Sequence, residues 1–116
     1  MDISITARHF EISDALRQLV DTRLSRLDRF NPRLSTVEVT LTEEKREKRV
    51  EAHAGIDGDL DIHAEAVAED FRAAVNKVSD KLARQLKRQH ELRRDHKAPS
   101  LNDEILLQES VEGNDS

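Results

Sequence analysis

The chain has 116 residues, 37% of them charged and 3% aromatic, and its formal net charge is −5. This length allows one domain with a modest core, and the lack of cysteine excludes disulfides and thiolate metal sites. There is no apolar run of membrane-spanning length and no signal-peptide pattern at the N-terminus, so we expect a cytoplasmic protein without a membrane partner.

The N-terminal part predicts a strand, a helix and a second strand. Apolar and polar residues alternate over residues 3–7, which is typical of a half-buried strand. Ser13 is a suitable N-cap for a helix with apolar residues at helical spacing, and Asn31-Pro32 should end that helix after Phe30. A second alternating segment, residues 37–41, follows as a strand.

The remainder predicts two more strands and a long helix. The charged run from Glu43 to Arg49 is expected to be a connecting loop, and residues 50–54 and 60–66 alternate like strands. The final helix runs from Phe71 to about Lys97, with a buried stripe of Phe71, Val75, Val78, Leu82 and Leu86. The order β-α-β-β-β-α predicts an α+β two-layer sandwich, with a four-stranded sheet covered by two helices on one face.

The third and fourth strands suggest a specific hairpin register. A three-residue loop, Ile56-Asp57-Gly58, with Gly58 in a left-handed conformation, keeps the apolar residues of both strands on one face. This register brings opposite or complementary side chains together. The facing pairs would be Arg49–Glu65, Glu51–His63 and His53–Asp61.

The outward face of this sheet is acidic, so RNA should avoid it. Its acids are Asp2, Glu38, Glu51, Asp61 and Glu65. His53 and His63 with Glu51 resemble a metal cluster, but cross-strand histidines with carboxylate partners are more often solvated ion pairs. We therefore expect no metal and no cofactor. The chain also lacks a nucleophile elbow and a phosphate-binding glycine loop, so we expect no enzyme activity.

The long helix concentrates positive charge. Residues 72–97 contain nine Lys or Arg and three acids. A stripe of cations recurs at helical spacing and is expected roughly opposite the buried stripe; its members are Lys77, Lys81, Arg84 and Arg88. The first helix carries Arg26 and Arg29 on one flank, with Arg23 at the border. Such stripes are often only solvated surface, yet a rigid cationic ridge also suits nucleic acid.

Two motifs carry a family resemblance. The segment MDISITARHFEISDALRQLV, especially its ITxxxxEIxxALR pattern from Ile5 to Arg17, and DKLARQL from Asp80 to Leu86 occur in the correct order. Residues 1–95 therefore resemble the short ribosome hibernation-promoting factor and ribosome-associated inhibitor family, also called the sigma-54 modulation protein family. The resemblance implies a fold similar to double-stranded RNA-binding domains.

The resemblance also implies a function. Family members occupy the messenger RNA and transfer RNA channel of the small ribosomal subunit, stop translation, and preserve idle ribosomes in stationary phase or stress. The implied partners are 16S ribosomal RNA, ribosomal proteins and a separate ribosome modulation factor. The protein is expected to be a monomer when it is not bound to the ribosome. The matching RNA-binding positions are Arg23, Arg26, Arg29, Lys81, Arg84 and Arg88, to which the charge pattern adds Lys77 and Lys87. This chain has Phe71-Arg72 where the family often has Met-Tyr.

The sequence predicts one folded domain followed by an acidic tail. Residues 1–97 should form the ribosome-binding domain, and residues 98–116, with five acids and no base, a disordered acidic tail. DKLARQL resembles the hibernation-promoting type and the tail resembles the inhibitor type, so the effect on ribosome dimerisation stays open. The alternatives are a general double-stranded RNA-binding module, or a protein-interaction regulator acting through the acidic sheet face.

Overall fold

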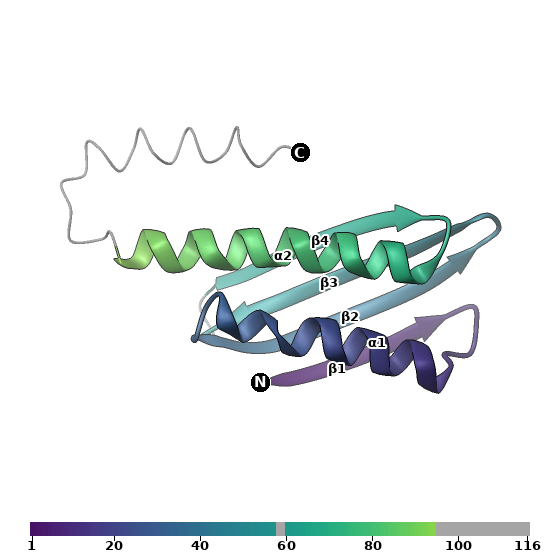
Figure 1. The fold of residues 1–116 in the computed structure, drawn as a ribbon, viewed down its shortest axis with the longest axis horizontal. Helices are drawn as coiled ribbons and strands as arrows, with labels where there is room; N and C mark the ends of the chain where they lie inside the picture. Colours follow the sequence, from purple (N-terminus) through teal and green to yellow (C-terminus); the bar gives the residue numbers. More distant parts are fainter. Residues whose placement is uncertain (58–59, 95–116) are drawn as a thin grey trace.

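The computed structural model describes residues 1–57 and 60–94, and it confirms the two-layer α+β fold. The elements are β1 (Asp2–Arg8), α1 (Asp14–Ser25), the 3₁₀ helix η1 (Leu27–Arg29), β2 (Leu34–Glu44), β3 (Glu47–Ile56), β4 (Leu60–Ala68) and α2 (Phe71–Arg94). The strands are ordered β1-β2-β3-β4 in one sheet, and both helices cover the same face (Figure 1). Within the described ranges, no helix is long and apolar enough to cross a membrane.

The first helix is a crossover between parallel strands. β1 pairs with β2 in parallel, whereas β2–β3 and β3–β4 are antiparallel. Parallel neighbours need a long connection, which α1 provides. Ser13 caps this helix as predicted, because its Oγ accepts a hydrogen bond from the Leu16 amide at 3.1 Å.

The predicted helix to Phe30 is not one continuous α-helix. α1 ends at Ser25, and the chain continues through Arg26 into η1. Two i→i+3 bonds tighten this last turn: Arg29 N to Arg26 O at 3.2 Å, and Phe30 N to Leu27 O at 3.0 Å. Apolar spacing alone does not distinguish this tighter turn from an α-helical one.

The predicted loop from Glu43 to Arg49 is wrong. β2 and β3 pair throughout this run, and only Lys45 and Arg46 remain in the turn. The strands extend beyond the core because the backbone ladder continues and charges of opposite sign meet. The ion pairs are Lys48–Glu43 at 3.4 Å and Arg49–Glu44 at 3.6 Å.

The predicted β3–β4 register is wrong by two residues. Glu51 lies opposite Glu65, His53 lies opposite His63, Arg49 lies opposite Val67, and Ile56 pairs with Leu60. The loop is therefore residues 57–59, and Asp57 takes a positive φ of 52°. Gly58 lies outside the described residues. The predicted inward face is retained because side chains alternate with a period of two.

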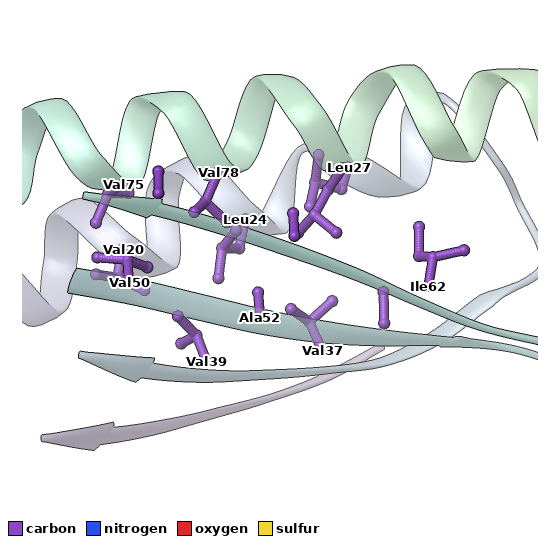
Figure 2. Close-up of a cluster of buried hydrophobic side chains, with 14 of the residues drawn as sticks. Val20, Leu24, Leu27, Val37, Val39, Val50, Ala52, Ile62, Val75 and Val78 are labelled. Carbon is purple, nitrogen blue, oxygen red and sulfur yellow. The ribbon is translucent and has the colours of Figure 1, made fainter. Parts of the chain in front are cut away.

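The core fills the space between the helices and the sheet (Figure 2). Val20, Leu24 and Leu27 project from the first helical segment toward Val37, Val39 and Ala52 of the sheet. The buried residues of α2 are Ala74, Val75, Val78, Leu82 and Leu86. Phe71 is only half-buried and stacks on Phe10, with ring centroids 4.7 Å apart. Residues 95–116, which include the predicted helix end and tail, lie outside the described residues.

Candidate nucleic-acid interface

A groove separates the first helical segment from α2 and brings three predicted arginines together. Arg23, Arg26 and Arg29 line one side, with Leu27 and Phe30 between them. The α2 side consists of Asn76, Ser79, Asp80 and Ala83. The flank of α1 and η1 that carries Arg26 and Arg29 therefore faces α2, which the sequence left open.

Two hydrogen bonds tie the walls of this groove together. At one end, Arg23 Nε donates to Asn76 Oδ1 at 2.8 Å. Just after η1, the buried Asn31 donates from Nδ2 to the Leu86 carbonyl at 3.2 Å. Because both bonds join residues more than fifty positions apart in sequence, they hold the first helical segment and the loop after it against α2.

Asn31 has a second role in the connection to β2. Its Oδ1 accepts a hydrogen bond from the Arg33 amide at 3.0 Å, and the residue is only 2% exposed. The sequence pattern identifies Asn31 only as part of a helix stop, and it does not single out Asn76. The sequence carries little indication of either role, because the hydrogen-bond partner of a polar side chain can be identified only once the positions of the helices and strands are known.

The cations of α2 divide between two sides of the helix. Lys87 follows Ala83 by four residues, so it lies on the groove side, one turn further along. Lys81 is half-buried, and its Nζ donates to the Glu65 carbonyl of β4 at 2.8 Å. Gln85 makes a similar bond to the His63 carbonyl at 2.9 Å.

The predicted stripe lies opposite the buried residues only in part, because at about 100° per residue Lys77 and Arg84 lie about 140–160° from Leu82, whereas Lys81 and Arg88 lie about 100–120° from it. Lys81 marks its β4 border, and Lys77, Arg84 and Arg88 lie within 60° of Lys81 at about 100° per residue. Lys77 and Arg84 are exposed, whereas Arg88 is half-buried. The eight predicted cations thus form two groups on the helical layer: Arg23, Arg26, Arg29 and Lys87 at the groove, and Lys77, Lys81, Arg84 and Arg88 on the β4 side of α2.

The two layers differ in electrostatic character. In the groove, three arginines accompany one acid, Asp80. On the outward sheet face, Glu38, Asp61 and Glu65 occupy positions that alternate with core residues. A polyanion that approaches this domain meets attraction on the helical layer and repulsion on the sheet.

Comparison with known proteins identifies the family. The family model described as Sigma 54 modulation protein / S30EA ribosomal protein matches residues 3–94, which include every helix and strand described above apart from the first residue of β1. The chain belongs to this family.

Individual relatives agree in sequence and in fold. A ribosome hibernation promoting factor from Salmonella typhimurium is 36% identical over 96 residues, which are 83% of this chain and all of the relative. One from Azotobacter vinelandii is 37% identical over 86 residues, which are 74% of this chain and 79% of the relative. The structure of a ribosomal subunit interface protein from Coxiella burnetii superposes with a TM-score of 0.71 at 29% identity, covering 77% and 97% of the two chains.

Proposed function

We propose that this protein binds the small ribosomal subunit in the channel used by messenger RNA and transfer RNA, and preserves idle ribosomes in an inactive state. The names of its relatives support a role in ribosome hibernation. The single observation that carries the finer proposal is the arginine groove. It places Arg23, Arg26 and Arg29 along a rigid seam between two helices.

The seam suits a phosphate backbone because its cations are held in place before binding. Guanidinium groups donate several parallel hydrogen bonds to phosphate oxygens, and Arg23 is already fixed through its Nε. Lys87, which lies on the groove side of α2, adds an exposed charge to this seam. Translation stops in this mechanism because the bound domain excludes messenger and transfer RNA from the channel, without a chemical step.

The experiment compares two double charge reversals that change the net charge by the same amount. Arg26→Glu with Arg29→Glu alters the groove, whereas Lys45→Glu with Arg46→Glu alters the β2–β3 turn. We expect the groove variant to lose co-sedimentation with purified small subunits and the turn variant to keep it. Equal loss in both variants, or wild-type binding by the groove variant, contradicts the proposal.

Lys81 is not used in this test because it bonds to the β4 backbone. Its reversal would disturb the packing of α2 on the sheet as well as any contact with RNA. Circular dichroism should show that both double variants keep the wild-type fold, because Arg26, Arg29, Lys45 and Arg46 are all exposed.

The salt dependence of binding provides an independent measure. If six to eight phosphates are contacted, affinity should fall by about 10³- to 10⁴-fold between 50 and 200 mM salt. The slope for the groove variant should be smaller by about two. A flat response, together with loss of binding on reversal of Glu38 and Asp61, would instead favour a protein partner on the sheet face. Equal competition by unrelated duplex RNA would favour a general RNA-binding module.

A further inference from the structure

The outward face of the β3–β4 hairpin gathers two carboxylates and two imidazoles. Glu51 lies directly opposite Glu65, and His53 lies directly opposite His63. Residues two apart on a strand share a face, so these four side chains form a rectangle on one rigid hairpin. The register predicted from the sequence did not bring these two like pairs together.

The ligand atoms within this rectangle are close. A carboxylate oxygen of Glu51, one of Glu65 and a ring nitrogen of His63 all lie within 4.8 Å of one another. Ligands of a tetrahedral Zn²⁺ ion at about 2.1 Å are separated by about 3.4 Å. Side-chain rotation can close this difference without movement of the backbone. The His53 ring adjoins that of His63, with centroids 4.6 Å apart.

The neighbouring groups orient these ligands. Arg49 Nη1 donates to Glu65 Oε2, which leaves the second oxygen of that carboxylate for another partner. His53 Nδ1 lies 3.5 Å from an Asp61 oxygen, and a carboxylate on one ring nitrogen commonly orients the other nitrogen toward a metal.

The charges also favour a cation at this position. Like charges placed directly opposite each other destabilise a sheet, and Glu51 with Glu65 is such a pair. Arg49 compensates part of this repulsion, because its guanidinium donates a hydrogen bond to Glu65. A divalent ion between the two carboxylates would remove the rest.

We propose that Glu51, His63 and Glu65 bind a divalent transition-metal ion, with His53 as the fourth ligand. Mixed imidazole and carboxylate ligands suit Zn²⁺, whereas Mg²⁺ and Ca²⁺ prefer oxygen alone. This site goes beyond the proposed ribosomal function. It lies on the sheet face away from α1 and α2, so each hypothesis can fail without the other.

The test is titration of the full chain, first stripped with a chelator, with zinc chloride. We expect saturable one-to-one binding by calorimetry, and shifts of the His63 ring signals in NMR spectra. Glu51→Gln and His63→Gln should each weaken binding by at least about tenfold. The matched control, His90→Gln, alters an imidazole on α2 and should leave the affinity unchanged.

Three results would overturn this proposal. They are binding that does not saturate at one equivalent, NMR shifts that spare His63, and equal weakening by His90→Gln; each indicates an adventitious ion only. Because the NMR shifts are measured on the unsubstituted protein, they decide the question even if a variant folds poorly. The melting temperature is a second readout, which zinc should raise for wild type and not for Glu51→Gln.

Discussion

Substitution of Asn31 by alanine tests how the groove is held together. Asn31 is nearly inaccessible to solvent, and its side-chain amide makes one hydrogen bond to the Leu86 carbonyl of α2 and one to the Arg33 amide within the loop before β2. Alanine removes both bonds. The Leu86 carbonyl keeps its own α-helical partner within α2, but the Arg33 amide loses its acceptor.

The expected loss of unfolding free energy is about 2 kcal/mol. A neutral hydrogen bond contributes about 1 kcal/mol net, so the loss of two such bonds accounts for this figure. In a domain of this size, such a loss lowers the melting temperature by about 8–16 °C.

Urea denaturation followed by circular dichroism measures this difference directly. The comparison is Ser35→Ala, which removes an exposed hydrogen bond from Ser35 Oγ to the Gly55 carbonyl and should cost less than about 0.5 kcal/mol. The two variants should differ in midpoint and share one m-value. If Asn31→Ala were as stable as Ser35→Ala, the proposed tie between the helices would not stabilise the domain.

Three further predictions follow from packing and charge. Leu82→Ala empties a fully buried position and should cost about 2–5 kcal/mol in the same assay. Gly55→Ala places a Cβ 2.8 Å from Thr36 Oγ1 and should cost about 1 kcal/mol, which a second change, Thr36→Ala, should largely restore. Truncation after Lys97 removes five acids and should leave translation inhibition intact but increase the fraction of dimeric ribosomes in sucrose gradients. An unchanged fraction, with the modulation factor present, would contradict a tail that opposes dimerisation.

The fold class was predictable because apolar periodicity identifies buried faces. Residues 3–7 and 50–54 alternate with period two, and the stripe from Val75 to Leu86 recurs at helical spacing. Burial of these positions against one another allows few arrangements other than helices on one sheet face. The charged run from Glu43 to Arg49 has no apolar signal, so the strand pairing there was missed.

The β3–β4 register could not be settled by the same pattern. A shift of two residues leaves every apolar side chain on the same face, so burial does not distinguish the two registers. The turn decides between them, and here Asp57 adopts the left-handed conformation. Two of the predicted side-chain pairs still form, although their residues are not directly opposite each other in the sheet. They are the diagonal contacts of Arg49 with Glu65 and of His53 with Asp61.

The positive charge of the candidate interface could be predicted from the sequence, but the shape of the interface could not. Charge counting finds Arg26, Arg29 and Lys81 equally well. It cannot show that the first two line a groove against α2, or that Lys81 bonds to the β4 backbone. Those distinctions depend on how two helices rotate on the sheet, which depends on the packing of the whole core.

The division of charge bears on how an acidic protein approaches RNA. Residues 1–97 contain equal numbers of bases and acids, so the net charge of −5 resides in residues 98–116. At physiological salt, charges separated by more than about 8 Å are largely screened. The groove arginines therefore act on a nearby phosphate chiefly through their own local field. Repulsion from Glu38 and Asp61 on the opposite layer adds an orienting torque, which favours approach with α1 and α2 facing the RNA. Neutralising these two acids lowers the overall repulsion between the protein and RNA, so it should leave binding to the small subunit intact and the dissociation rate unchanged.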